Sequence, residues 1–506
     1  MMALKADEIT KHNTASSCWI VIDSKVYDVT SYLEMHPGGA AILVKRGGRD
    51  ATAGFRKVHS PDSLQHLPKG SCLGEIDAAT QASLTALAAS SSESSSPSTA
   101  ASSPSPAQDG PPHIAHCVKV SDFEAAAQGV LSRNALTYVS SSANSALSLQ
   151  ANLASWSRIR FRPRVLRDVQ HVSPQTSIFG HASPYPFYPS AMGQLGRCHP
   201  GAEAELVRAI ARRGAHALIS AESTLPLEDI AAALKDEQQK PPLLPPPSSQ
   251  TAAFPPSQLH YQLYVHTSRA ITTARIRRAR AAGYRSLWIT VDTPVLGKRT
   301  ADRRLQAASA LDAGLPAATA AQAGLGRRTH APQGHLSPSV SWADLAWIQA
   351  EWGADRPVVL KGVQSAEDAR LALQHGCRGV ALSNHGGRQA HSAPDALTTL
   401  LEIREYAPEV LLAGLEVFVD GGCRDGADVL KAVCLGATAV GVGRPFFYAM
   451  GAYGGLGVER CLDLLAEELQ SGMRLLGITS LDEARPEMVN ATRLLNEMWR
   501  PEKSRL

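Results

Sequence analysis

Eight short apolar runs recur along most of the chain, separated by stretches rich in Ala, Leu, Arg and Glu. Nearly every run ends in polar or glycine residues. This alternation is typical of repeated βα units. Eight parallel strands with polar groups at their carboxyl ends predict an α/β fold, a (β/α)8 or TIM barrel, whose active site is assembled at those ends. The runs lie at 187–192, 216–220, 261–265, 287–292, 357–362, 379–386, 416–422 and 439–444.

A doubly wound parallel sheet is the alternative arrangement of such units. It is disfavoured because no G-x-G-x-x-G motif stands on a turn from strand to helix. The two Gly-rich turns of the series, at 420–424 and 442–444, come last. Barrels bind phosphate at the ends of their last two strands, so the order of these turns favours the barrel.

A stretch rich in Ser, Ala and Pro divides the chain. Residues 78–112 have too little apolar surface to offset the entropy of ordering, which predicts a disordered linker. We therefore expect a small domain at 1–77 and a barrel domain at 113–506. Two further segments, 240–257 and 305–337, are rich in Pro or in Ala and Gly and are expected to be exposed loops.

Composition excludes several classes of partner. The net charge is only +4 and the chain contains no long Lys/Arg run, so nucleic acid is not expected as a partner. No run of eighteen apolar residues predicts a membrane span, and the first ten residues lack the order of a signal peptide. The eight cysteines are scattered without a C-x-x-C pair, which favours reduced thiols in an intracellular, soluble protein.

The last three residues, Ser-Arg-Leu at 504–506, are a variant of the Ser-Lys-Leu peroxisomal address. An ordinary polar tail is the alternative, with a cytoplasmic location. The mitochondrial intermembrane space is disfavoured because we see no presequence before the first domain.

Two histidines indicate the chemistry of the small domain. His36 lies in an HPGG turn, and His59 follows it by 23 residues (59 − 36). A six-coordinate haem needs one imidazole on each face, and glycines beside a ligand allow close approach of the porphyrin. With Trp19 and the segment 26–29, this stretch resembles cytochrome b5, which implies a small α+β domain that binds haem b through His36 and His59. Such a haem relays single electrons.

The large segment carries four motifs that resemble one family. They are VDTPVLGKR (291–299), SNHGGRQ (383–389), DGGCRDGADVLKA (420–432) and VGRPFFYA (442–449). Together they identify the segment as a member of the FMN-dependent 2-hydroxy-acid oxidases and dehydrogenases, the family of glycolate oxidase. With the haem domain in front, the whole chain resembles the flavocytochromes b2, which are L-lactate cytochrome c oxidoreductases.

The resemblance assigns roles around a 2-hydroxy acid. His385 would be the base, and the charge of Asp292 would stabilise the imidazolium that forms. Arg388 would hold the substrate carboxylate through two hydrogen bonds, with Arg299 as a second cation. Two tyrosines, Tyr138 and Tyr264, would hydrogen-bond the substrate. The motif around Tyr138 departs from the family pattern, because Val139, Ser142 and Ser145 replace Tyr, Gly and Asp.

The resemblance also implies an FMN site. Lys361 would place its ammonium where negative charge accumulates on the reduced ring. The phosphate would lie at the ends of the last two strands, where backbone N–H groups and arginines gather. The residues implied in binding FMN are Ser190, Ala191, Ser220, Gln262, Thr290, Lys361, Ser383, Asp420, Gly421, Gly422, Arg424, Gly443 and Arg444.

Several alternatives stay open at this point. Glu222 occupies a position that is apolar or aromatic in the family, so lactate, glycolate, mandelate and longer hydroxy acids all remain candidate substrates. The electrons can move as a hydride or through a carbanion. The acceptor after haem is cytochrome c or another one-electron carrier. The alternatives to this reading are a peroxide-forming oxidase with an accessory haem module and an inactive haem protein. The family resemblance implies a homotetramer.

Overall fold

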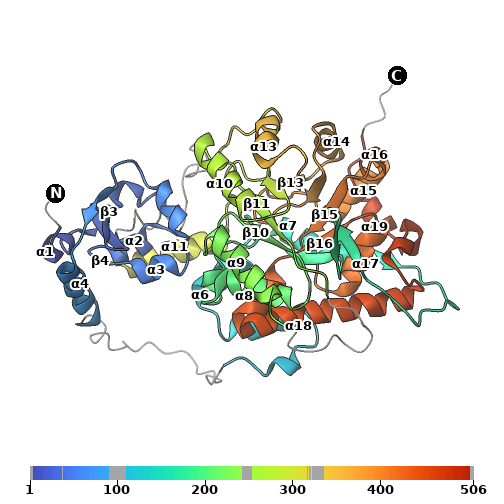
Figure 1. The fold of residues 1–506 in the computed structure, drawn as a ribbon, viewed down its shortest axis with the longest axis horizontal. Coiled ribbons are helices and arrows are strands. Elements are labelled where there is room, and N and C mark those ends of the chain that lie inside the picture. The colour runs from blue at the N-terminus through green and yellow to red at the C-terminus, as the bar shows by residue number, and fades with distance from the viewer. Residues whose placement is uncertain are drawn as a thin grey trace. The chain divides into compact units, whose positions relative to one another are not determined.

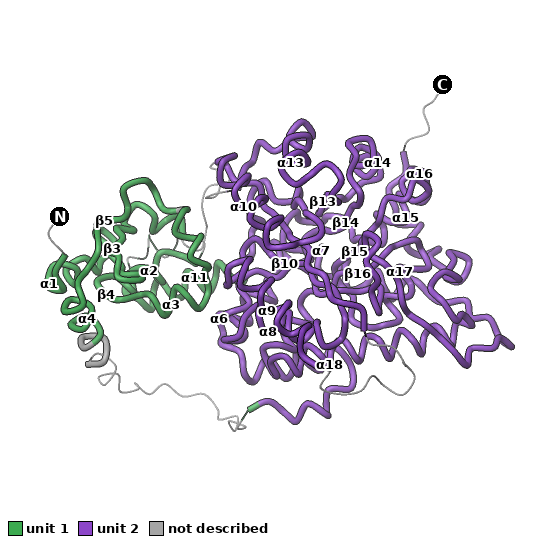
Figure 2. Tube along the Cα trace, viewed as in Figure 1, with its two compact units in different colours: residues 1–110, 301–335 green, residues 111–300, 336–506 purple. Residues whose placement is uncertain are grey.

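The computed structural model describes residues 4–36, 38–90, 110–241, 254–315 and 336–501, with three single positions at 317, 319 and 321. The chain divides into two compact units (Figure 2). One contains residues 1–110 and 301–335, and the other contains residues 111–300 and 336–506. The expected barrel domain at 113–506 is therefore interrupted, since 301–335 cluster with the N-terminal unit.

The small unit is built on a five-stranded sheet in the order β1-β2-β3-β5, with β4 paired in parallel to β2. Ile20 and Ile22 on β2 pack into one apolar cluster, and Val21 packs into another, as the two-residue period of a strand requires. Its strands are β1 (Asn13–Thr14), β2 (Ser17–Ile22), β3 (Lys25–Asp28), β4 (Arg49–Asp50) and β5 (Cys72–Glu75), and its helices are α1 (Ala6–Ile9), α2 (Ala40–Arg46), α3 (Thr52–Arg56), α4 (Ala78–Ser90) and most of α11 (Thr300–Asp312).

Two sequence predictions need correction here. Residues 78–90 form helix α4 instead of the start of a disordered linker, because Leu84 is buried against Ile9, Val21 and Val26. The predicted exposed loop at 305–337 begins as helix α11, whose Ala310 is buried. The remainder of the predicted linker, 91–109, and much of the two predicted loops lie outside the described residues.

The large unit contains an eight-stranded parallel sheet in the order β10-β11-β12-β13-β14-β15-β16-β9, which forms a nearly closed barrel (Figure 1). Each of the eight predicted runs overlaps one of its strands, so the predicted (β/α)8 fold is confirmed. The strands are β9 (Phe187–Pro189), β10 (Ala217–Ser220), β11 (Leu259–Leu263), β12 (Leu287–Thr290), β13 (Val358–Val363), β14 (Gly379–Leu382), β15 (Glu416–Asp420) and β16 (Ala439–Val442).

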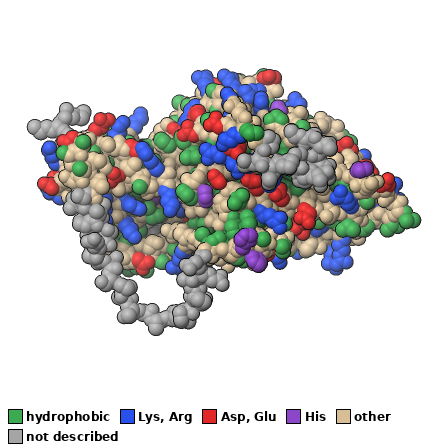
Figure 3. All heavy atoms as spheres, turned by 60° about the horizontal axis from the view of Figure 1, so that its bottom comes forward, with side chains coloured by type: hydrophobic (Ala, Val, Ile, Leu, Met, Phe, Trp, Pro, Cys, Tyr) green, Lys and Arg blue, Asp and Glu red, His purple; other side chains and the backbone are tan. Residues whose placement is uncertain are grey.

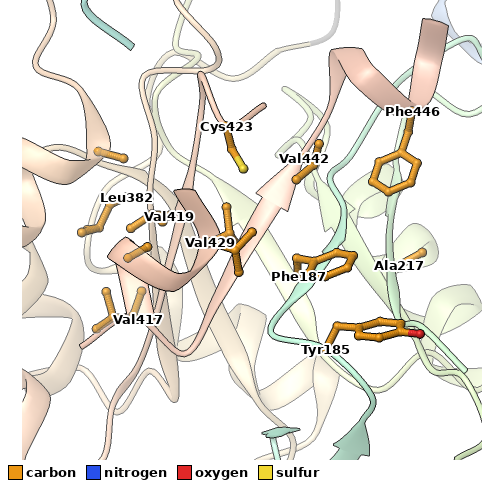
Figure 4. Close-up of a cluster of buried hydrophobic side chains, with 14 of the residues drawn as sticks. Tyr185, Phe187, Ala217, Leu382, Val417, Val419, Cys423, Val429, Val442 and Phe446 are labelled. Carbon is orange, nitrogen blue, oxygen red and sulfur yellow. The ribbon is translucent and has the colours of Figure 1, made fainter. Parts of the chain in front are cut away.

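Helices surround this barrel and bury its outward side chains. Figure 4 shows Phe187 and Val442 of neighbouring strands close to Phe446 of α18 and Val429 of α17. The helices are α5 (Asp122–Gln128), α6 (Arg133–Ser140), α7 (Leu147–Arg158), α8 (Ala202–Ala211), α9 (Leu227–Gln238), α10 (Arg269–Ala281), α13 (Asp344–Trp352), α14 (Ala366–Gln374), α15 (Ala396–Tyr406), α16 (Pro408–Leu412), α17 (Gly426–Cys434), α18 (Arg444–Leu476) and α19 (Thr492–Leu495). Two short pairs, β6 (Arg160–Phe161) with β17 (Val489–Asn490) and β7 (Thr176–Ile178) with β8 (His181–Ser183), complete the unit.

The barrel interior is arranged in layers. One apolar layer takes a side chain from nearly every strand, namely Tyr188, Leu218, Trp288, Val359, Ala381, Phe418 and Ala439. Side chains of a strand alternate between its two faces, so the residue two places further on also points inward. Those next positions, at the carboxyl ends, are Ser190, Ser220, Thr290, Lys361, Ser383, Asp420 and Gly441, and on β11 Gln262 follows His260. The register of the strands thus places a polar ring above an apolar core.

On the face shown in Figure 3, acidic and basic side chains are interspersed. Among the helices that the structure describes, none is long and apolar enough to cross a membrane.

Candidate active site and cofactor sites

Neighbouring members of the polar ring are hydrogen-bonded to one another. The Ser220 hydroxyl donates to Oε1 of Gln262 at 3.1 Å, and Nε2 of Gln262 donates to the Thr290 hydroxyl at 2.9 Å. All three residues are buried. The ring therefore presents fixed polar atoms at the carboxyl end of the barrel, on side chains predicted to bind the flavin.

Lys361 supplies a buried cation to this ring. Its Nζ lies 2.7 Å from Oδ2 of Asp420 and 3.0 Å from Oγ of Ser383. Only 7% of the Lys361 side chain and 10% of the Asp420 side chain are exposed. Ser190, on the neighbouring part of the ring, places Oγ 3.5 Å from the same Asp420 oxygen. A buried ammonium held in this way fits the electron-rich edge of a reduced flavin.

His385 and Asp292 form a hydrogen-bonded pair at the edge of the ring. Nδ1 of His385 lies 2.9 Å from Oδ1 of Asp292, whose side chain is only 1% exposed. Burial alone would raise the pKa of Asp292, but the charge and hydrogen bond of His385, together with Lys361, outweigh it and lower that pKa. The pair is thus a buried carboxylate that orients an imidazole.

The loop that carries His385 has an unusual backbone. His385, Gly386 and Gly387 all have positive φ, at 61°, 64° and 76°. A Cβ at Gly387 would lie 2.6 Å from the backbone nitrogen of Leu149 in α7, so this position needs glycine. A histidine in the left-handed region is strained, and such strain persists where the surroundings fix the geometry.

Tyr264 links the imidazole to a group of charges. Its hydroxyl lies 3.3 Å from Nε2 of His385. The pKa of Tyr264 is strongly raised, first by burial and then by the charge of Asp292. The charge of Arg299 lowers this pKa, and that of Glu222 raises it. Arg299 and Glu222 are therefore both close enough to act on the tyrosine. Nε of Arg299 is buried and has no hydrogen-bond partner among the described residues.

Arg388 and Tyr138 lie together but make backbone contacts. Nη1 of Arg388 donates to the carbonyls of Tyr138 at 2.8 Å and Ser141 at 3.1 Å, and its Cζ lies 5.2 Å from the centre of the Tyr138 ring. The Tyr138 hydroxyl donates to the Gly193 carbonyl at 3.1 Å. The structure therefore brings the two predicted substrate ligands to one place, with part of their hydrogen-bonding capacity directed to the backbone.

The ends of the last two strands bring two arginines together. Burial lowers the pKa of Arg444 to about 10, and the nearby charge of Arg424 is the next cause. Helix α18 begins at Arg444 and its N-cap, Gly443, supplies no side-chain cap. A Cβ added at Gly443 would meet nothing within 4 Å. Two like charges, an uncapped helix start and open space fit an anion such as the FMN phosphate.

The other two predicted glycines have a structural reason. A Cβ at Gly422 would lie 1.9 Å from the carbonyl oxygen of Asn152, and one at Gly421 would lie 2.9 Å from its Nδ2. Both glycines have positive φ, at 85° and 97°. Close packing of helix α7 therefore accounts for this doublet without a ligand. The three Arg444 nitrogens also donate to backbone carbonyls, of Val139, Ser141 and Gly386.

The small unit brings His36 and His59 close together, with their ring planes inclined at 62°. Their ring centroids are 5.9 Å apart. Nδ1 of His36 lies 3.2 Å from the carbonyl oxygen of Gly39, a contact of the kind that would orient this imidazole as an axial ligand of haem. Phe55, Leu64 and Leu67 belong to the apolar cluster of this unit. Two opposed imidazoles beside apolar side chains fit a six-coordinate haem.

Two functional contacts were not predicted from the sequence. The Thr293 hydroxyl donates to Oδ1 of Asp292 at 2.8 Å and lies 3.4 Å from Nδ1 of His385, so it helps to fix the pair. Asn384 exchanges side-chain hydrogen bonds with Asn152 of α7, at 2.7 and 2.8 Å. Both residues stand inside or beside the motifs already identified, but only the spatial contacts show their roles.

The fold and the sites define a class. A barrel with a cation-containing polar ring, an imidazole–carboxylate pair and an anion site, joined to a bis-histidine unit, is an oxidoreductase with a flavin and a haem. Residues 127–491 match the family described as FMN-dependent dehydrogenase, and residues 5–77 match the cytochrome b5-like haem/steroid binding domain. The chain belongs to the FMN-dependent dehydrogenases and carries a cytochrome b5-like domain, with FMN and haem as its cofactors.

Relatives that share both parts support this assignment. The chain is 34% identical to an L-lactate dehydrogenase (cytochrome) of Wickerhamomyces anomalus, over 97% of this chain and 81% of that protein. The same identity holds to the L-lactate dehydrogenase (cytochrome) of Saccharomyces cerevisiae, over 96% and 79%. A solved flavocytochrome b2 mutant matches with a TM-score of 0.65 and 32% identity, covering 77% of this chain and 90% of that one.

Proposed function

We propose that this enzyme oxidises L-lactate, or a closely related L-2-hydroxy acid, to the 2-oxo acid and passes the electrons one at a time through its haem to cytochrome c. The observation that carries the proposal is the chain of contacts from Asp292 through His385 to Tyr264 at the edge of the polar ring. The names of the two yeast relatives, both L-lactate dehydrogenases (cytochrome), support the substrate and the acceptor.

The residues present divide the chemistry as follows. Bound FMN supplies a two-electron acceptor, and bound haem supplies a one-electron relay. Arg388 and Arg299 bind the substrate carboxylate, with Tyr138 beside them. Substrate binding requires the Arg388 side chain to turn from these backbone carbonyls toward the substrate carboxylate. Lys361 holds a positive charge in the ring where negative charge develops.

His385 is the proton acceptor. Its Nε2 lies 3.3 Å from the Tyr264 hydroxyl, which places a donor and an acceptor together where the substrate hydroxyl would lie. Asp292 stabilises the imidazolium on the opposite ring nitrogen. A hydride route takes the hydroxyl proton to His385, and a carbanion route takes the α-proton there. Both routes therefore need the same neutral imidazole.

Glu222 bears on the choice of substrate. A Cβ added at Gly193 would lie only 3.2 Å from the Cβ of Glu222. The absence of a side chain at Gly193 therefore leaves room for Glu222 beside Tyr138. An acid near the pocket disfavours a second carboxylate on the substrate through like-charge repulsion. Lactate and glycolate are therefore proposed before hydroxy acids that carry a second acid group.

The decisive experiment is an anaerobic spectrum of the holoenzyme before and after L-lactate, followed by glycolate if lactate fails. Bleaching of the flavin with a rise of reduced b-haem bands supports the whole route. Bleaching of the flavin with an oxidised haem points instead to an oxidase, and relatives that cover the barrel include an L-lactate oxidase of Nostoc at 34% identity. No change in either spectrum contradicts the proposed substrate class.

Three finer statements are part of the proposal. Reduction of two molecules of cytochrome c for each lactate oxidised tests the acceptor. Light scattering of the holoenzyme tests the homotetramer. The tail at 504–506 lies outside the described residues. A fluorescent fusion with and without Ser-Arg-Leu distinguishes a peroxisomal from a cytoplasmic location.

A further inference from the structure

Gln389 is a buried side chain on the loop after β14, and its carboxamide contacts three backbone groups of the loop after β12. Nε2 donates to the carbonyl oxygens of Asp292 at 3.0 Å and Val295 at 2.8 Å. Oε1 accepts a hydrogen bond from the backbone amide of Gly297 at 3.1 Å. Both amide hydrogens and the carbonyl oxygen of this side chain are therefore bound by one segment, residues 292–297.

The backbones of the two loops also pack closely at this point. A Cβ added at Gly297 would lie 2.8 Å from Cα of Gln389 and closer still to the carbonyl oxygen of Arg388. Gly297 does not have a positive φ, so the close approach of the other loop, and not the backbone conformation, requires glycine here. The side chain of Gln389 thus holds a segment that already lies against its own backbone.

The segment held in this way connects two charged side chains of the candidate active site. It begins at Asp292 and leads directly to Arg299. Residues 291–298 form neither helix nor strand, and the side chains of Val291 and Val295 are exposed. An exposed, irregular loop has few buried contacts of its own to fix it. Three hydrogen bonds from one buried side chain are therefore a large part of what can keep this loop in place.

The catalytic pair spans the same two loops. Nδ1 of His385, on the loop after β14, lies 2.9 Å from Oδ1 of Asp292, on the loop after β12. The length of this hydrogen bond depends on how the two loops are placed relative to each other. Displacement of a catalytic group by about 1 Å can lower a rate by roughly 10²-fold. The contacts of Gln389 therefore bear on the geometry of the pair without involving the imidazole or the carboxylate.

We propose that Gln389 is a positioning residue for the oxidation. It holds segment 292–297 against the loop of His385, so that Asp292 stays on the imidazole and Arg299 stays beside the substrate carboxylate. Gln389 acts through these two residues and needs no contact with the substrate. The effect on turnover rests on the proposed function, whereas the effect on binding of a carboxylate is measured without turnover.

The chemistry of the side chain makes this role separable from packing. A primary amide supplies two donors and one acceptor, whereas methionine, which has a similar length, supplies no donor. An ionised glutamate has no donor for the two carbonyls that Gln389 binds, but a protonated glutamate recovers one. Burial raises the pKa of a carboxyl group, which brings this recovery toward neutral pH. Substitution by Glu should therefore give a defect that depends on pH, and substitution by Met a defect that does not.

Stopped-flow reduction of FMN by L-lactate in the full-length holoenzyme tests the proposal. Gln389→Met should lower the rate by about 10- to 100-fold because the pair loses its placement. It should also raise the Kd of oxalate, a small dicarboxylate followed by the flavin spectrum, by roughly threefold or more, since Arg299 is displaced. Gln349→Met is the matched control, because Nε2 of Gln349 donates to the His375 carbonyl at 2.9 Å, and both quantities should stay within a factor of two of wild type.

The pH profile gives a readout that a role in packing would not change. The rate of Gln389→Glu relative to wild type should rise by about fivefold from pH 8 to pH 6, while the relative rate of Gln389→Met stays constant. A rate and an oxalate Kd in Gln389→Met within a factor of two of wild type would overturn the proposal. A relative rate of Gln389→Glu that is independent of pH would overturn it as well.

Two further outcomes are also decisive. If Gln389→Met does not retain FMN, the pH profile of Gln389→Glu decides alone. If the wild-type enzyme does not reduce its flavin with L-lactate, the proposed function fails, and the oxalate Kd of the Gln389 variants still decides whether this side chain positions the loop.

Discussion

Nδ1 of His385 and Oδ1 of Asp292 are 2.9 Å apart, although the two residues are on different strand ends. Thr293 adds a hydroxyl to the same carboxylate oxygen at 2.8 Å. The imidazole is thereby fixed in the tautomer that donates from Nδ1 and accepts at Nε2, which faces Tyr264. This relationship determines what single substitutions should do.

Replacing Asp292 by Asn removes the negative charge that stabilises the imidazolium. We expect kcat for L-lactate to fall by roughly 10²–10⁴-fold, the usual contribution of general base catalysis. The rate of anaerobic flavin bleaching in a stopped-flow instrument measures it. Thr293→Val, which keeps the carboxylate, is the control and should lose far less. A bleaching rate in Asp292→Asn within a factor of two of wild type would refute the role of the pair.

The like charges of Arg424 and Arg444 predict a phosphate contact. Arg424→Gln should raise the Kd of FMN by about 10- to 100-fold, because a charge-assisted hydrogen bond contributes about 1.5–3 kcal/mol. Fluorescence quenching of FMN added to the apoprotein measures the Kd. Arg404→Gln is the matched control, since that guanidinium donates to the Leu435 carbonyl away from the polar ring. Equal FMN affinity in the two variants would show that Arg424 does not contact the phosphate.

Gly38 should be required for the haem site. A Cβ there would lie 2.8 Å from Cε1 of His36 and force the imidazole to shift. Gly38→Ala should therefore speed haem loss to apomyoglobin by on the order of tenfold, equivalent to about 1.4 kcal/mol. Gly54→Ala is the control, because its nearest neighbour is the flexible end of Arg46, 3.1 Å away. Similar rates of haem loss in both variants would argue that His36 tolerates displacement.

The recurrence of apolar runs along the sequence predicted much of this architecture. All eight apolar runs overlapped a barrel strand, because a strand buried on both sides needs a continuous apolar segment whatever its neighbours are. The start of the predicted linker was harder to place. Residues 78–90 are Ala- and Ser-rich and carry few large apolar side chains, yet buried Leu84 attaches the helix to Val21 and Val26. Such a tertiary contact has no local signature.

The candidate site, too, could be predicted only in part from the sequence. Its residue types could be recognised by motif, and the strand register then explains why Ser220, Gln262 and Thr290 meet. The motif did not show that Gly422 is required by the approach of Asn152, or that Arg444 also holds the backbone carbonyls of Val139 and Ser141. These depend on helix α7 and the end of α6, more than 200 residues away in sequence. Long-range packing, unlike strand period, cannot be read from adjacent residues.

Buried titratable side chains at the amino end of the barrel predict that the stability of the fold depends on pH. His216 and His260 lie with ring centroids 5.8 Å apart, and Nε2 of each is buried with no hydrogen-bond partner among the described residues. Burial lowers the pKa of His216 to about 4 and that of His260 well below its usual value. Glu416, on the same end, has its pKa raised to about 7, first by burial.

The lowered histidine pKa values and the raised pKa of Glu416 change the free energy of unfolding in opposite directions as the pH changes. Below pH 6.5 the unfolded histidines bind protons while folded His216 stays neutral to about pH 4, so the free energy of unfolding falls as the pH drops through that window. Each such group contributes a slope of about 1.4 kcal/mol per pH unit. Between about pH 4.5 and 7, folded Glu416 keeps a proton that the unfolded chain has lost, so its contribution to stability falls as the pH rises.

Urea unfolding of the holoenzyme between pH 4.5 and 8, followed by tryptophan fluorescence, separates the two effects. His216→Asn should flatten the loss of stability below pH 6.5 by up to about 1.4 kcal/mol per unit, because the residue that replaces it does not titrate. Glu416→Gln should act in the opposite direction, with the larger gain in stability above pH 7. His391→Gln, at an exposed position, is the matched control and should leave the profile unchanged. Parallel profiles for wild type and His216→Asn would show that this imidazole titrates alike in the folded and unfolded chain.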